Sequence, residues 1–437
     1  MAQYRKDTNR YLGDGTSIFE VVMLADQYGN VIGPANPSGM AVDAFGRARV
    51  SNPLTLFDSY NRYDANGKFH TATVSGGSIT FVANTAALQM NLTTANNAQV
   101  IRESKRVFAY QPGKSLQILQ TFIMNPAKEG LRQRVGYFNG ENGIFLELDG
   151  DTLSFVRRSN STGTPTDTKI TQANWNLDTL DGTGPSSLTL DISKAQIIFI
   201  DVEWLGLGTV RVGFVINGQL IHCHSFHHAN EIDGPYMTTA CLPVRYEITN
   251  TAETANNSTL KQVCSSVISE GGYELRGKPR SIGTPANTTV TLATAGVWYP
   301  IVSMRLKSTH IDSIVIPTNI SILGEGNGGR VKYGLIENGT LSIAGGGTVT
   351  FTSANNDSSV EYNMTANVIT GGIVMQQGFL GVTNQSADSV TLDRDALFKF
   401  QLERNGLTQT PAILTLAVMP GTAGDEASGS IDWEEIT

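Results

Sequence analysis

GIFLELDGDTLSFVRR, residues 143–158, is the stretch that decides the fold class of this chain. Apolar and polar residues alternate on both sides of Asp149-Gly150, and a period of two is typical of β-strands. An Asp-Gly pair favours the tight turn of an antiparallel hairpin. The segment VRVGFVINGQLIHC, residues 210–223, repeats the pattern around Asn217-Gly218. Two such hairpins predict an antiparallel sheet.

Strand-length alternating runs continue on both sides of these hairpins, from about residue 53 to residue 275. SLQILQTFIM at 115–124 and QIIFIDVEWL at 196–205 are examples, and the one helical piece expected is short, at 192–195. Many short strands with almost no amphipathic helix indicate a β-sandwich. We therefore predict an all-β chain with a jelly-roll or lectin-like β-sandwich over 53–275.

A second β domain is expected after a turn-rich joint. The segment RGKPRSIGTPANTT, residues 276–289, contains the Pro and Gly of a linker. Alternating strands and an Asn338-Gly339 hairpin signal then predict a C-terminal β-sandwich over 290–420. The acidic, Gly/Ser-rich residues 421–437 are expected to be loosely held unless Ile431 and Trp433 dock on a neighbour.

Residues 1–52 differ from the rest because their apolar pieces are short and interrupted by turns. They are too broken to form a core of their own, so we predict an extended docking arm that a partner covers. The apolar side chains expected to dock are those of Ile18, Phe19, Val21, Val22 and Leu24.

Composition supports the β assignment, and the charges along the chain argue against nucleic acid and membranes as partners. Only 16% of residues are charged and Gly occurs 45 times, which favours strands and turns. A net charge of -8 argues against a nucleic-acid-binding surface. The N-terminus, MAQYRKDTNR, carries charges where a signal peptide is apolar, so neither secretion by a leader nor membrane insertion is expected.

Three cysteines, Cys223, Cys241 and Cys264, lack the spacing of a disulfide framework or a zinc ribbon, and we expect reduced, buried thiols. His222 and His224 alternate on a predicted strand and so share a face, which makes them weak candidates for a metal site. The alternative is that both are packed strand residues, and no metal and no cofactor are predicted.

Catalytic motifs are absent from the sequence. It contains no GxSxG, phosphate-binding loop, HExxH or dinucleotide fingerprint, and we predict that the chain is not an enzyme. Three carboxylate pairs are candidates for glycan hydrolysis, and each also fits a turn, a loop or a solvent-facing strand: Asp149 with Asp151, Asp178 with Asp181, and Asp201 with Glu203. Four tyrosines are candidates for stacking on sugars, Tyr60, Tyr63, Tyr137 and Tyr236, and half-burial is the alternative.

Three stretches resemble the virion structural proteins of tailed phages, particularly marine phages and cyanophages. They are VDAFGRARVSNPLTLFDSYNRYD at 42–64, ESKRVFAYQPGKSLQILQTFIM at 103–124 and GFVINGQLIHCHSFHHAN at 213–230. The resemblance implies a virion component with no catalytic residues, and it covers about residues 1–275. In the most distinctive part, Phe45 is expected to act as an anchor and Gly46 to permit a tight turn. Arg47 and Arg49 share a face and are expected to pair with carboxylates or carbonyls of a neighbouring subunit, and the alternative is that both are simply solvated.

The leading hypothesis is a fibre or appendage subunit located in the virion. We expect it to be a homotrimer by analogy, and to contact other virion proteins through its arm. The alternative is a module that binds a host-surface glycan for attachment, which is compatible with the first hypothesis. A third, a polysaccharide depolymerase, requires a working carboxylate pair.

Overall fold

Antiparallel β-strands build both halves of the chain. The computed structural model describes residues 52–274, 276–326, 329–382 and 399–436, and the backbone alone of 11–12, 19–20 and 386–391. Within these ranges there is no α-helix, and three 3-10 turns lie at Ala83–Thr85 (η1), Gln172–Asn174 (η2) and Ser308–His310 (η3). Across the same ranges, no helix has the length and hydropathy of a membrane span. The all-β prediction is confirmed.

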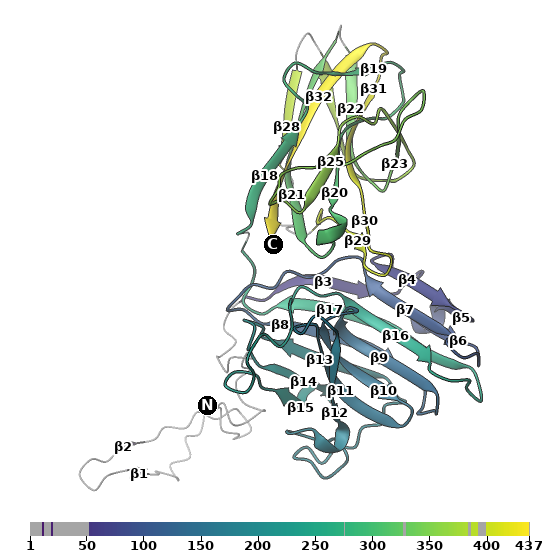
Figure 1. Ribbon diagram of the computed structural model, residues 1–437, viewed down its shortest axis with the longest axis vertical. Helices are drawn as coiled ribbons and strands as arrows, with labels where there is room; N and C mark the ends of the chain where they lie inside the picture. Colours follow the sequence, from purple (N-terminus) through teal and green to yellow (C-terminus); the bar gives the residue numbers. More distant parts are fainter. Residues whose placement is uncertain are drawn as a thin grey trace, which may run out of the picture.

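Two sheets face each other in the first sandwich (Figure 1). The seven-stranded sheet runs β12 (Thr166–Thr171), β11 (Thr152–Ser159), β10 (Gly143–Asp149), β9 (Leu131–Phe138), β16 (Val244–Asn250), β7 (Gln99–Ser104), β4 (Phe69–Val74). The eight-stranded sheet runs β15 (Gln219–Phe226), β14 (Val210–Ile216), β13 (Gln196–Val202), β8 (Leu116–Ile123), β17 (Ser258–Ser269), β6 (Ala87–Leu92), β5 (Gly77–Val82), and β3 (Leu54–Tyr60) also pairs with β17.

Alternation in the sequence explains why these strands bury one face. In β8, LQILQTFI, every second residue is buried, and the inward side chains of both sheets form one apolar core. The hairpin predicted at Asn217-Gly218 is confirmed, because both residues have positive φ between β14 and β15, as a type I′ turn requires. The hairpin of β10 and β11 closes at Gly150-Asp151, one residue later than predicted.

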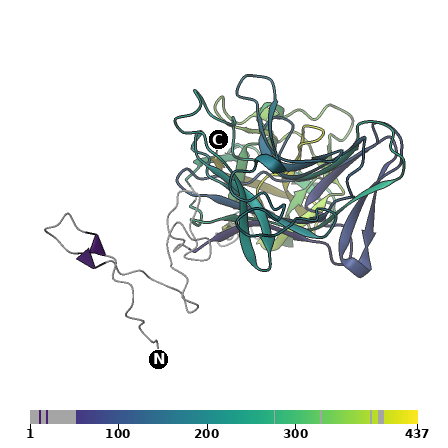
Figure 2. The same cartoon turned by 90° about the horizontal axis from the view of Figure 1, so that it is seen from below.

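The second sandwich stacks on the first, as both views show (Figures 1 and 2). One sheet runs β18 (Lys278–Gly283), β32 (Asp425–Ile436), β21 (Ile314–Glu325), β28 (Ser386–Thr391), and β19 (Val290–Leu292) pairs with β32. The other runs β24 (Thr352–Ser353), β25 (Val360–Asn363), β20 (Tyr299–Leu306), β31 (Leu414–Pro420), β22 (Gly329–Glu337), β27 (Ile373–Val382). Three two-stranded pairs complete the assignment: β1 (Tyr11–Leu12) with β2 (Phe19–Glu20), β23 (Thr340–Ser342) with β26 (Val368–Thr370), and β29 (Arg404–Asn405) with β30 (Thr410–Pro411).

The linker and the loose tail predicted from sequence are both wrong. Residues 278–283 form β18, and residues 425–436 form β32, a twelve-residue strand that pairs with β18, β19 and β21. Ile431 and Trp433 are buried in the core of their own sandwich. Small and acidic residues occupy most positions of β32 and conceal the alternation of buried and exposed side chains in this strand. Asn338-Gly339 is also no hairpin, since β22 and β23 belong to different sheets.

Candidate functional site

The outer face of the seven-stranded sheet carries a row of alternating charges that crosses the sheet and continues into the second sandwich. Because side chains alternate along each strand, residues at every second position of β12, β10, β9, β16 and β7 meet on this face. We call this row the charge ladder, and its members in order are Lys169, Glu147, Arg134, Glu247, Arg245, Glu103, Arg404 and Asp312.

Neighbouring members of the charge ladder form ion pairs at hydrogen-bonding distance or close to it. Arg134 Nε lies 2.7 Å from Glu147 Oε2, and its Nη1 lies 3.4 Å from Glu247 Oε1. Arg245 joins the next two carboxylates, with Nη2 2.8 Å from Glu247 Oε2 and Nη1 3.1 Å from Glu103 Oε2. Burial raises the pKa of Glu247, but the charges of Arg245 and Arg134 outweigh it and hold that pKa below its usual value.

A small apolar cluster lies under the charge ladder and explains why the charges pack so tightly. Phe138, Phe145 and Val156 point outward from β9, β10 and β11 yet are fully buried. The guanidinium of Arg134 lies 5.3 Å from the ring centre of Phe145, and that of Arg245 lies 5.2 Å from the ring centre of Phe138. The arginines therefore cover aromatic rings and pair with glutamates at the same time, which fixes their orientation.

Arg404 at the start of β29 connects the ladder to the second sandwich. Its Nη1 donates to Glu103 Oε1 at 2.8 Å and to the carbonyl of Ser104 at 3.1 Å, and its Nε donates to Asp312 Oδ1 at 3.0 Å. Beside it, Gln401 donates to the carbonyl of Val107. An apolar cluster from both sandwiches completes this junction, and it comprises Val107, Ala109, Ile314 and Ile316 with Cys241, Tyr273 and Ile436 packed against them.

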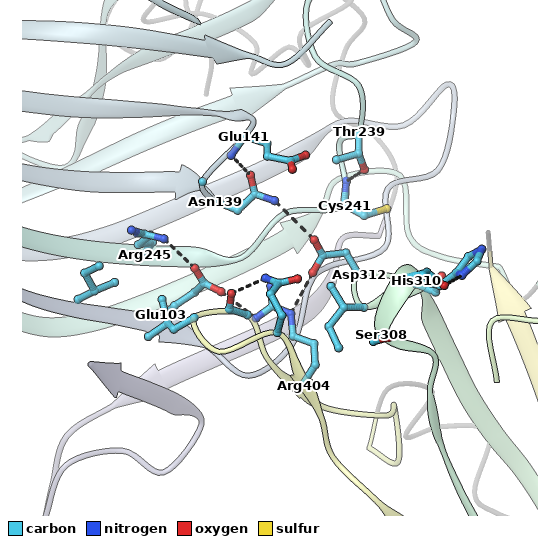
Figure 3. Close-up of a pocket in the computed structure, with 18 of the residues that line it drawn as sticks. Glu103, Asn139, Glu141, Thr239, Cys241, Arg245, Ser308, His310, Asp312 and Arg404 are labelled. Atoms are coloured by element: carbon cyan, nitrogen blue, oxygen red, sulfur yellow. Dashed lines mark hydrogen bonds and ion pairs between the residues drawn. The ribbon is translucent and has the colours of Figure 1, made fainter. Parts of the chain in front are cut away.

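A cleft of about 850 Å³ opens between the two sandwiches at the end of the charge ladder (Figure 3). One wall is the outer face of β4, β7 and β16 with the β9–β10 turn, and the other wall is η3 with the residues that follow it and the β29–β30 hairpin. The polar side chains that line it come from both sandwiches: Gln99, Glu103, Asn139, Glu141, Thr239, Arg245, Ser308, Thr309, His310, Asp312, Ser313, Arg404 and Gln409.

Hydrogen bonds within the walls hold several of these groups in place. Asn139 Oδ1 accepts the N–H groups of Glu141 and Asn142, which shapes the β9–β10 turn, and its Nδ2 lies 3.5 Å from Asp312 Oδ2. Both carboxylate oxygens of Glu103 accept guanidinium hydrogen bonds, from Arg245 and Arg404. Figure 3 shows Glu141 on the β9–β10 turn of the first sandwich and His310 at η3 of the second. The cleft therefore presents fixed donors and acceptors, and both carboxylate oxygens of Glu103 already accept hydrogen bonds.

The predicted site residues do not gather in this cleft. His222 stacks edge-on against Phe199, and His224 Nδ1 accepts the N–H of Asn176, so each has a packing role. Nowhere in the described ranges do three or more His, Cys, Asp or Glu side chains form a group able to hold a metal ion. The docking residues Ile18, Val21, Val22, Leu24, Phe45, Gly46, Arg47 and Arg49 lie outside the described residues, and only the backbone of Phe19 is described.

The carboxylate pairs also serve local structure. Asp178 accepts the N–H groups of Leu180 and Ser186 in its loop, as a loop residue should. Asp201 and Glu203 were expected to face solvent, but both are buried, and Asp201 pairs with Arg211 at 2.5 Å.

The charge ladder was not found from the sequence. Arg and Glu occur at alternating positions of β9, β10 and β16, but the sequence does not show that they meet, because the register between these strands is set by the fold.

Burial divides the tyrosine and cysteine candidates. Tyr137 and Tyr236 lie in the core and cannot stack on a sugar, whereas Tyr60 and Tyr63 are 56% and 81% exposed.

The three cysteines are free thiols, with Cys223 buried and Cys241 half-buried. Cys264 is exposed, contrary to the prediction, because it lies on the outward face of β17.

No protein family matches the sequence, and no curated protein matches it. Among solved structures, the fold resembles a protein of unknown function from Shewanella oneidensis MR-1, with 11% identity over 52% of this chain and 92% of that one (TM-score 0.34). The carbohydrate recognition domain of Emp47p shares 12% identity over 49% and 94% (TM-score 0.32). A legume lectin-like domain from Entamoeba histolytica shares 14% over 54% and 99% (TM-score 0.28). Two of these three bear the names of carbohydrate-recognition or lectin-like domains, and the likeness is one of fold alone.

Proposed function

We propose that this chain is a non-catalytic appendage subunit of a tailed-phage virion and that its interdomain cleft binds a host-surface glycan. The observation that carries the binding half is the cleft itself. Its walls combine three amides, four hydroxyls and several charged groups, with Leu407 and Ile101 as apolar contacts. Sugar hydroxyls both donate and accept hydrogen bonds, so a wall of mixed, fixed polar groups matches them. A volume of about 850 Å³ has room for a short oligosaccharide.

Binding, and not hydrolysis, is favoured by how the buried glutamates are used. A glycosidase needs one carboxyl that keeps a proton and a second that is free to act as nucleophile or base. Glu103, Glu147 and Glu247 each accept hydrogen bonds or ion pairs from two or more cations in the charge ladder. We therefore propose that none of them is a general acid. Release of reducing ends from a polysaccharide that is lost in Glu103→Gln would contradict this.

The cleft can be tested by filling it. Gly140 lies in the cleft wall, and a Cβ added there meets nothing within 4 Å, so Gly140→Trp should fold normally and obstruct the opening. On a glycan array, the wild type is expected to bind saturably and Gly140→Trp to lose binding. Gly234→Trp is the matched control, because Gly234 is equally open but does not line the cleft.

Individual hydrogen bonds can be tested by truncating amides. Gln99→Ala and Gln409→Ala each remove one amide from the cleft, and each is expected to weaken glycan binding about five-fold, the effect of losing one hydrogen bond of about 1 kcal/mol. Gln89→Ala and Gln196→Ala change the same side chain on the eight-stranded sheet and should leave binding unchanged. Equal effects in all four variants would contradict a site in the cleft.

The virion half of the proposal rests on the resemblance of residues 42–64, 103–124 and 213–230 to phage structural proteins. We propose that the arm of this subunit, residues 1–52, docks on other virion proteins. Imaging of purified particles with this chain labelled should place it on an appendage. Absence of the label from intact particles would overturn this half while leaving the glycan measurement intact.

A further inference from the structure

Strand β27 is an unusually apolar edge of the second sandwich. It is the last strand of its six-stranded sheet and pairs only with β22 among the described strands. Along its length Ile373 is 65% exposed, Val374 40% and Phe379 66%. An exposed edge strand offers unpaired backbone N–H and C=O groups, and exposed apolar side chains add a hydrophobic driving force for pairing.

Three other edges of the described sheets carry features that normally prevent pairing, whereas the uncharged edges β4, β5 and β15 have only six to eight residues. β18 begins with Lys278, Pro279 and Arg280, and β24 has only two residues. β12 includes Asp167 and Lys169. By contrast β27, IVMQQGFLGV, has ten residues with no charge and no proline. Its one irregularity is a register shift opposite Leu335 and Ile336, which leaves the segment from Gln376 to Val382 regular.

We propose that β27 is the strand at which two copies of this chain meet, edge to edge. The partner strand is β27 of a second copy, because two uncharged strands can pair without electrostatic repulsion. The exposed apolar side chains of each copy would then pack against those of the other. On the neighbouring strand, Lys332 lies between the rings of Trp298 and Phe379, at 5.7 and 6.0 Å from their centres, so its charge is directed along the sheet face and not at the edge. Such a contact is self-complementary and joins two six-stranded sheets.

Light scattering on the full chain tests this contact. The wild type at micromolar concentration should show about twice the monomer mass of 46.9 kDa, or an even multiple if further contacts add. The double variant Ile373→Lys with Phe379→Lys should fall to half the wild-type mass, because paired lysines repel across the edge. Ile79→Lys is the matched control, since Ile79 is also an exposed apolar residue on an edge strand, β5, and it should keep the wild-type mass.

A wild-type monomer, an odd-numbered assembly, or a double variant that keeps the wild-type mass would overturn the proposal. Thermal unfolding of the double variant within a few degrees of the wild type shows that the sandwich is intact. If the double variant fails to fold, hydrogen exchange on the wild type tests whether β27 pairs with a second copy. Outward amides of β27 should exchange more slowly at high than at low protein concentration, and equal rates would overturn the pairing. Neither readout involves the glycan, so this proposal and the one for the cleft fail independently.

Discussion

Arg404 shows at the level of one residue how the two sandwiches are held together. It is 2% exposed and donates to Glu103, Asp312 and a backbone carbonyl, which come from both halves of the chain. A buried guanidinium is costly unless each of its donors is engaged, and here its partners are also buried or half-buried. The orientation of the second sandwich therefore depends on this side chain more than on any exposed ion pair.

Replacing Arg404 by Met should lower the free energy of unfolding by about 3 kcal/mol, because Glu103 and Asp312 lose a partner in a poorly hydrated junction. Urea unfolding measures the change. Arg276→Met is the control, since Arg276 is paired with Glu274 on the open surface, and its effect should stay within about 0.5 kcal/mol. Equal effects from both variants would mean that the junction adds no stability.

His228 gives the folded chain a dependence on pH. It stacks on Tyr236 at 3.9 Å between ring centres, and burial lowers its pKa to about 4. Burial likewise lowers the pKa of His224 to about 4. Between pH 6.5 and 4 the unfolded chain binds protons at these rings and the folded chain does not, so stability should fall as the pH is lowered through this window.

The test compares the slope of unfolding free energy against pH. His228→Phe preserves a ring beside Tyr236 and should make the slope between pH 6.5 and 4 shallower, although His224 still contributes. The variant should also be less stable at pH 7, because the hydrogen bond between Nδ1 and the carbonyl of Gly208 is lost. His310→Phe changes an exposed histidine and should leave the slope unchanged. An unchanged slope in His228→Phe would contradict the assignment.

At the level of elements, β32 is the strand on which the second sandwich depends. It pairs with β18, β19 and β21 and brings Ala427, Ile431 and Trp433 into the core. Removing residues 425–437 is therefore expected to unfold the second sandwich and leave the first one folded. Limited proteolysis followed by mass spectrometry should recover a stable fragment covering about residues 52–274. Survival of the second sandwich would contradict the role of β32.

The hairpins of β14 with β15 and of β10 with β11 were predictable from sequence because their signals are local, whereas the Asn338-Gly339 signal was misleading because β22 and β23 belong to different sheets. Asn217-Gly218 adopts positive φ at both residues, which few other pairs tolerate, and alternation on both sides fixes which face is buried. The charge ladder was not predictable, because Glu103, Arg245 and Arg404 are separated by more than a hundred residues and meet only after strand order and register are set. The same holds for the cleft, whose two walls come from different sandwiches. β32 was missed for another reason, since its glycines, serines and acids conceal a regular alternation.

At the level of the whole molecule, the arm and the sandwiches should have separable roles. Both described sandwiches have their own cores, so removal of residues 1–40 is expected to leave their thermal unfolding unchanged. The truncated chain should still bind glycan, while its incorporation into particles should be lost. Particle assembly in the presence of truncated or full-length chain, followed by electrophoresis of the particles, measures this. Normal incorporation of the truncated chain would contradict a docking arm.

The place of β32 after every other strand of the second sandwich has a consequence for synthesis. Domains fold as units while the chain leaves the ribosome, and the first sandwich is complete once β17 has emerged. The second sandwich cannot close until β32 has emerged, so β18 and β21 lack their shared partner while the strands between them and β32 are synthesised. A stalled or prematurely terminated chain would expose them. Ile436 packs at the junction of the two sandwiches, so a sequence inserted directly after it is expected to disturb the cleft.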